Sequence, residues 1–167
     1  VYFKQGGNTV TKLTASGNKA DGVDYAKGGG MYLGSGTNTV KDSTIDGNIA
    51  DSDTNAQGGG IFAESGELNI VNSKITNNRA GVESSTTGAS GSAIYLDPAT
   101  NVAGVTTSVI NLEATASADK AVSEGNKTNG DYRVSGIHFG NSEGGNSRYN
   151  AELNISGAGE VVLRNPV

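Results

Sequence analysis

Residues 1–21 read VYFKQGGNTVTKLTASGNKAD, and residues 31–51 read MYLGSGTNTVKDSTIDGNIAD. The two segments align without a gap, and the alignment places Tyr2 on Tyr32. Residues 61–81, IFAESGELNIVNSKITNNRAG, continue the same register at the same thirty-residue spacing. Self-similarity at a fixed spacing is the sequence signature of a repeat architecture. We therefore expect the chain to be built from stacked copies of one structural unit.

The later copies of the repeat are less regular. Residues 91–96 (GSAIYL) restate residues 58–63 (GGGIFA), and residues 135–139 (SGIHF) restate them again. The fourth copy is expected to be enlarged by a loop insertion of about residues 114–132. We interpret residues 1–167 as a single unit of five coils, which start near residues 1, 28, 58, 91 and 135.

Each copy contains three short runs of apolar residues, and these runs are bounded by Gly, Asn, Asp and Ser. Such runs and borders are signals of strands and turns. No segment shows the sustained 3.6-residue apolar period of a helix. Alternation places apolar columns on the inward face of each strand. The inward parity changes between the second and third strands, which requires a bend near residues 11–12, 41–42 and 71–72. The pattern predicts an all-β parallel β-helix of about five coils with three short strands per coil.

The first strand of each coil also predicts an outward column of rings. Because Met31 and Leu33 are assigned inward, the residue between them must point outward. Exposed aromatic residues can stack on sugar rings or dock onto another protein. They can equally stack on one another and stiffen the sheet, or lie beneath a loop. This candidate binding column consists of Tyr2, Tyr32, Phe62, Tyr95 and His138.

A column of asparagines follows the third strand of the first three coils. Side-chain amides that repeat at coil spacing can bond to the next coil and to the backbone of the turn. We expect a structural ladder, and the alternative is contact with a ligand. The column consists of Asn18, Asn48 and Asn78.

Composition excludes several classes of function. The chain has 26 Gly, 34% hydrophobic residues, no Cys and a net charge of −5. Without Cys there is neither a disulfide framework nor a zinc–thiolate site. The acidic balance disfavours nucleic acid as a partner, and no stretch is apolar enough to cross a membrane as a helix.

A single His gives little support to nucleophilic catalysis, so we expect no enzyme and no cofactor. The carboxylates of Asp21, Asp24, Asp51 and Asp53 are candidate calcium ligands, but the calcium-binding glycine-rich nonapeptide is absent, so no metal is expected.

The repeat resembles a known family of surface proteins. Residues 58–62 (GGGIF) with 73–78 (SKITNN), and residues 28–32 (GGGMY) with 43–48 (STIDGN), resemble the passenger domains of bacterial autotransporter adhesins of the AIDA type. The related GGAI and FxxN repeats of chlamydial polymorphic outer membrane proteins are similar, although Ile-Asp-Gly-Asn stands here where those proteins have Phe-x-x-Asn.

The resemblance implies a right-handed β-helix that is extracellular and displayed at the bacterial cell surface, held at the outer membrane through a C-terminal part. It further implies adhesion, aggregation or biofilm formation, with a host-surface protein, a glycan or like molecules on neighbouring cells as partners. Two alternatives remain open. One is a β-helical polysaccharide lyase or hydrolase, although no repeated column combines Asp with Arg or Lys. The other is a purely structural stalk.

Overall fold

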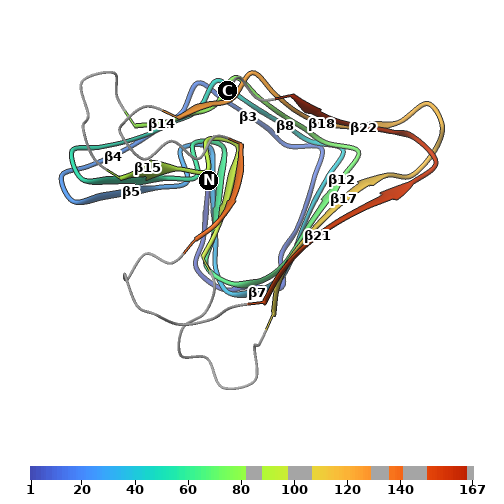
Figure 1. Cartoon of the computed structure of the whole chain (residues 1–167), viewed down its shortest axis with the longest axis horizontal. Helices are drawn as coiled ribbons and strands as arrows, with labels where there is room; N and C mark the ends of the chain where they lie inside the picture. The colour runs from blue at the N-terminus through green and yellow to red at the C-terminus, as the bar shows by residue number, and fades with distance from the viewer. Residues whose placement is uncertain (82–87, 98–106, 129–135, 141–149, 165–167) are drawn as a thin grey trace.

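The structure of the chain is a computed structural model, and it describes residues 1–81, 88–97, 107–128, 136–140 and 150–164. Within these residues every pairing between strands is parallel, and each strand pairs with its counterparts in the neighbouring coils. The five coils therefore form a parallel β-helix, as the repeat predicts (Figure 1).

Three five-stranded sheets enclose the main body, which is three-sided in cross-section (Figure 1). Sheet A contains β1 (Tyr2–Phe3), β6 (Met31–Leu33), β11 (Ile61–Ala63), β16 (Ile94–Leu96) and β20 (Ile137–Phe139). Sheet B contains β2 (Thr9–Thr11), β7 (Gly36–Lys41), β12 (Gly66–Val71), β17 (Thr107–Ala114) and β21 (Asn150–Gly157). Sheet C contains β3 (Thr14–Ser16), β8 (Thr44–Asp46), β13 (Lys74–Thr76), β18 (Lys120–Glu124) and β22 (Glu160–Arg164).

The predicted register and bends are those of the structure. Tyr2 pairs with Tyr32 and Val10 with Val40, at the thirty-residue spacing of the repeat. Between sheets B and C the chain turns at residues in the left-handed region, whose φ values are 48° to 56°. One such residue reverses the parity of the side chains, so that apolar residues on both strands face inward. These turning residues are Lys12, Asp42 and Asn72.

The main core is a stack of aliphatic side chains, one layer per coil. In sheet A, Met31, Leu33 and Ile61 are fully buried, as the alternation predicts. Sheets B and C add columns that include Val40 and Ile45. Because neighbouring coils lie about 4.8 Å apart, each layer needs only a few aliphatic residues. This explains how a chain with 34% hydrophobic residues forms a continuous core.

Beyond the three predicted strands, each of the first three coils has two further strands, which form a thin arm beside the main body (Figure 1). Sheet D contains β4 (Lys19–Gly22), β9 (Ile49–Ser52), β14 (Arg79–Ala80) and β19 (Lys127–Thr128). Sheet E contains β5 (Tyr25–Lys27), β10 (Asn55–Gln57) and β15 (Ala89–Ser90). A separate core of small residues lies within the arm, namely Ala26, Ala50, Ala56, Ala80 and Ala89, with Ala20 packed against it.

The arm joins the body through a narrow neck, at which glycine stands in the second and third coils. A Cβ atom on Gly29 would lie 2.4 Å from the backbone carbon of Ile49. One coil further on, a Cβ atom on Gly59 would lie 2.4 Å from the backbone oxygen of Arg79. Neither residue has a positive φ, so close approach of two backbones is the reason for glycine at this neck.

The fourth coil differs from the sequence-based expectation. The inserted loop predicted at about 114–132 contains two strands, β18 and β19, while residues 129–132 lie outside the described part. Val122 pairs with Lys74, so this segment supplies the third strand of its coil. What is enlarged here is the corner between β17 and β18 in coil four, and the corner between β21 and β22 in coil five projects beside it (Figure 1).

Candidate functional site: the crook between body and arm

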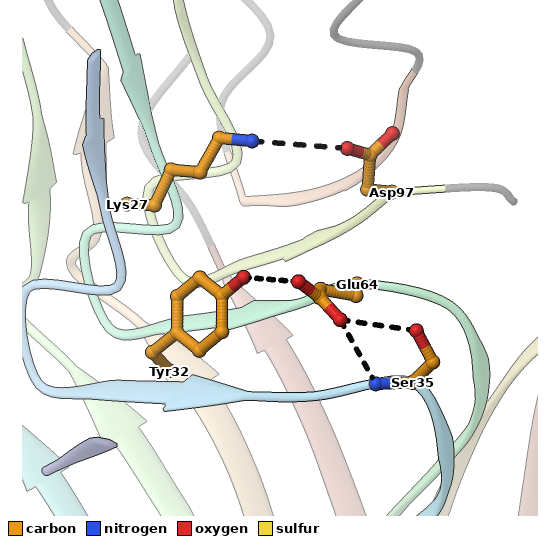
Figure 2. A network of polar contacts seen from close by, with 5 residues as sticks. All are labelled: Lys27, Tyr32, Ser35, Glu64 and Asp97. Atoms are coloured by element: carbon orange, nitrogen blue, oxygen red, sulfur yellow. Dashed lines mark hydrogen bonds and ion pairs between the residues drawn. The ribbon is translucent and has the colours of Figure 1, made fainter. Parts of the chain in front are cut away.

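The outward face of sheet A meets the outward face of sheet E at an angle, which we call the crook. Lys27, at the end of β5, bridges the two faces. Its Nζ lies 4.6 Å from the centroid of the Phe62 ring on β11 and 5.6 Å from that of the Tyr25 ring. It also lies 4.0 Å from the carboxylate of Asp97, just beyond β16 (Figure 2). A cation over an aromatic ring is stabilised by the ring quadrupole, so Lys27 helps hold the arm against the body.

The five predicted rings form one ladder along the wall of the crook. Their centroids are 4.7 Å apart between Tyr2 and Tyr32, 5.2 Å between Tyr32 and Phe62, and 5.5 Å between Phe62 and Tyr95. The His138 ring continues the series 5.1 Å beyond Tyr95, at a tilt of 38°. These separations match the spacing between coils, so mutual stacking, one of the two interpretations from the sequence, is what the rings do.

The outward orientation of the column does not leave all of its rings exposed. The side chains point away from the main core, but Phe62 is 0% exposed and Tyr95 is 1% exposed. Only Tyr2, at the first coil, is strongly exposed, at 65%. Ring faces inside the ladder are occupied by neighbouring rings. The physical reason for the difference is the crook itself, because the arm lies beside the outward face of sheet A and Lys27 lies over the Phe62 ring.

A polar network anchors Tyr32, the second ring of the ladder. The Tyr32 hydroxyl donates a hydrogen bond to Glu64 Oε1 (Figure 2). Glu64 Oε2 accepts hydrogen bonds from the Ser35 amide at 3.2 Å and the Ser35 hydroxyl at 3.0 Å. Burial, then the bond to Glu64, raises the pKa of the Tyr32 phenol. Burial opposes ionisation of Glu64, but hydrogen bonds from Tyr32 and Ser35 outweigh it and lower the pKa of this carboxyl. At neutral pH the network therefore consists of a neutral phenol and a carboxylate.

Two further polar residues belong to sheets E and A, namely Gln57 and His138. Gln57 pairs with Lys27 in sheet E and is buried, and its Oε1 has no hydrogen-bond partner in the described part of the chain. His138 is half-buried, and burial lowers the pKa of its imidazole. A neutral imidazole at the far end of the ladder fits a role as another ring in the stack.

The asparagines form a hydrogen-bonded ladder on the opposite side of the neck. Asn18 Nδ2 donates to Asn48 Oδ1 at 2.9 Å, and Asn48 Nδ2 donates to Asn78 Oδ1 at 3.0 Å. The same oxygens accept the backbone N–H groups of the preceding asparagines. Asn126, in the fourth coil, extends the ladder by accepting from Asn78 at 3.0 Å. Sequence reasoning missed Asn126, although Gly125 precedes it as Gly17 and Gly47 precede Asn18 and Asn48.

Metal binding finds no support in the described residues, where no group of three or more His, Asp or Glu side chains is placed to hold an ion. Asp21 and Asp51, considered above for calcium, both bond the ammonium group of Lys19, at 3.0 Å and 2.6 Å. The cation at this place on the arm is therefore a lysine of the chain itself.

The fold defines a class of protein: a solenoid repeat protein of the parallel β-helix type, with a second, alanine-packed lobe on its first coils. Comparison of the chain with protein-family models, with curated proteins and with solved structures gave no match. The described part of the chain contains no helix that is long and apolar enough to cross a membrane.

Proposed function

We propose that this chain is a binding module of a bacterial surface adhesin, which acts without catalysis in cell adhesion, aggregation or biofilm formation. The observation that carries the proposal is a pair of exposed tyrosines at the first coil. Tyr2, on sheet A, is 65% exposed, and Tyr25, on sheet E, is 52% exposed. Large rings exposed on a polar solenoid favour a contact with another molecule.

The two tyrosines belong to one surface, because ring and cation contacts connect them. Tyr25 lies beneath the Lys27 ammonium, which also lies over Phe62, and the ladder then leads through Tyr32 to Tyr2. Of the rings in the ladder, Tyr2 offers the most exposed surface in the described part of the chain. A sugar ring or an apolar side chain of a partner can stack there.

The proposed partners are a host-surface protein or glycan, or a like molecule on a neighbouring cell. Rigid support favours such a contact, since Tyr2 is held by a stack and Tyr32 by Glu64. An aromatic side chain held in place loses little conformational entropy on binding. Display outside the cell fits a chain without Cys, because stacking of coils supplies stability without disulfides.

Bacteria displaying the chain test this proposal. Replacing Tyr2 and Tyr25 with Ser should lower clumping or attachment to host cells by about tenfold, as expected for aromatic anchors of an interface. Thr37→Ala, an exposed change on sheet B, is the matched control. Circular dichroism should show the same β signal in all variants. Undiminished clumping and attachment by the double variant would rule out this surface as the binding site. Depolymerisation of pectin or alginate by the purified chain would favour the alternative function of a polysaccharide lyase.

A further inference from the structure

A second concave surface lies at the corner between sheets B and C, away from the crook. In the first three coils this corner is a single left-handed turn, and in the second and third it is formed at Asp42 and Asn72. In the fourth coil the corner is longer, and residues 115–119 project between β17 and β18. The step between the short and long corners forms a groove of about 430 Å³, which Asp42, Thr44, Asn72, Lys74, Asp119 and Lys120 line.

The projecting corner is fixed by hydrogen bonds to the coil below. Asn72 Oδ1 accepts from the Thr115 amide at 2.9 Å, and Asn72 Nδ2 donates to Thr115 Oγ1 at 2.9 Å. Asp119 Oδ2 accepts from the Thr115 hydroxyl at 2.6 Å and from the Ala116 amide at 2.9 Å. These bonds, that of Thr115 first, lower the pKa of the Asp119 carboxyl. The groove is therefore formed before any ligand arrives, which reduces the entropic cost of binding.

Several polar groups in the groove are available to a ligand. Lys120 is paired with Glu160 at 2.7 Å, but the Lys74 ammonium has no partner in the part of the chain that the structure describes. Asp42 Oδ1 accepts one long hydrogen bond, from Asn72 Nδ2 at 3.4 Å, and the carboxylates of Asp42 and Asp119 both line the groove. Two aspartates and two lysines give the lining a balanced charge. A balanced site does not select an ion, whereas alternating carboxylates and ammonium groups match the hydroxyls of a sugar, which both donate and accept.

We propose that this corner groove binds a neutral saccharide unit. The Asp42 and Asp119 carboxylates accept from the sugar hydroxyls, and the Lys74 ammonium donates to a hydroxyl or ring oxygen. The groove volume lies within the range of about 300–1,000 Å³ typical of small-molecule sites. It has no aromatic platform, so a single site should bind weakly, with a Kd on the order of 1 mM. Many displayed copies would convert such a site into firm attachment through multivalency.

The test is an NMR titration of the labelled chain with lactose, maltose and cellobiose, beside digalacturonate and inorganic phosphate. Saturable shifts at the amides of residues 42–44, 72–74 and 118–120 with at least one neutral disaccharide are expected. Asp119→Asn and Lys74→Met should each weaken that binding by about tenfold, the effect of one hydrogen bond to a charged group. Asp24→Asn and Lys4→Met, exposed changes elsewhere, should leave it unchanged.

Three results would overturn the assignment: no saturable shift with any neutral disaccharide, a response to digalacturonate or phosphate alone, or binding that both groove variants retain in full. If the groove variants fail to fold, which the same spectra reveal, Asp42→Asn provides a milder change with the same expected loss, because Asn72 occupies the same left-handed turn position one coil later. The groove and the crook are separate surfaces, so these spectra and the clumping assay can fail independently.

Discussion

The asparagine ladder supports a quantitative prediction, because two of its members differ in burial but not in chemistry. Asn78 is fully buried and takes part in four side-chain hydrogen bonds. It accepts from the backbone N–H and the side chain of Asn48, and donates to the Ile45 carbonyl and to Asn126. Asn18 is exposed, and its side chain donates one bond, to Asn48.

Asn78→Ala leaves the buried N–H group of Asn48 without its acceptor and removes three further bonds. A buried donor without an acceptor costs about 1–3 kcal/mol and each net bond about 0.5–1.5 kcal/mol, so the variant should lose about 2.5–7.5 kcal/mol of unfolding free energy. Asn18→Ala should lose at most about 1 kcal/mol, since one solvated bond is removed. Urea unfolding followed by circular dichroism measures both changes.

Asn78→Asp sharpens the same prediction through its pH dependence. The introduced carboxylate would face two acceptors, Ile45 O and Asn126 Oδ1, where the amide donates. Burial and these acceptors should raise the pKa of the carboxyl in the folded state. The variant should therefore be closest to the parent in stability below about pH 4, the ordinary pKa of Asp, and should become less stable than the parent as the pH rises. Equal destabilisation by Asn78→Ala and Asn18→Ala would show that the buried ladder does not support the turns.

Three other perturbations probe the neck, the core and the crook. Gly59→Ala places a Cβ atom 2.4 Å from a backbone oxygen and should lower the free energy of unfolding by about 3 kcal/mol or more. Gly47→Ala, where the Cβ atom meets open space at a φ of 64°, should lower it by only about 1–2 kcal/mol. Similar melting temperatures of the two variants would contradict the reason given for glycine at the neck. Ile61→Asp should lower the free energy of unfolding by about 3–5 kcal/mol, because it buries an unpaired charge in the main core. An unchanged melting curve would mean that the inward and outward faces of sheet A are inverted. Glu64→Gln should be less stable than the parent at neutral pH. The difference in stability should disappear as the pH falls through the pKa of Glu64, which lies below its ordinary value of 4.5. A difference that does not depend on pH would mean that the carboxylate charge does not stabilise the network with Tyr32.

The three strands of the main body could be predicted because their inward residues are large and aliphatic. Met31, Val40 and Ile45 each mark a different strand, and their register is the repeat itself. The arm could not be predicted in the same way, since its inward residues are alanines, which contribute little to an apolar pattern. Ala26 and Ala56 recur at the repeat spacing, but small residues recur in turns as well.

The residues of the ring ladder could be predicted from the sequence, but the burial of most of its rings could not. Alternation alone places Phe62 opposite the main core, and the structure agrees. Its burial depends on the arm, which local sequence does not reveal. In the fourth coil, Ser123 occupies the inward position held by Ile75 one coil earlier, so the apolar signal of that strand is lost. A strand whose inward positions hold polar residues lacks the apolar alternation from which strands are predicted.

The stacking of coils also determines how the molecule responds to force. Hydrogen bonds between coils run along the axis of the rod, and each coil is joined to the next by one crossing of the chain. Tension on the chain therefore peels a terminal coil strand by strand and leaves the coils beyond it folded. A thirty-residue coil that peels away adds roughly 100 Å of extended chain. Under tension such a rod would lengthen in steps of one coil, and each step would limit the force carried by whatever the rod connects.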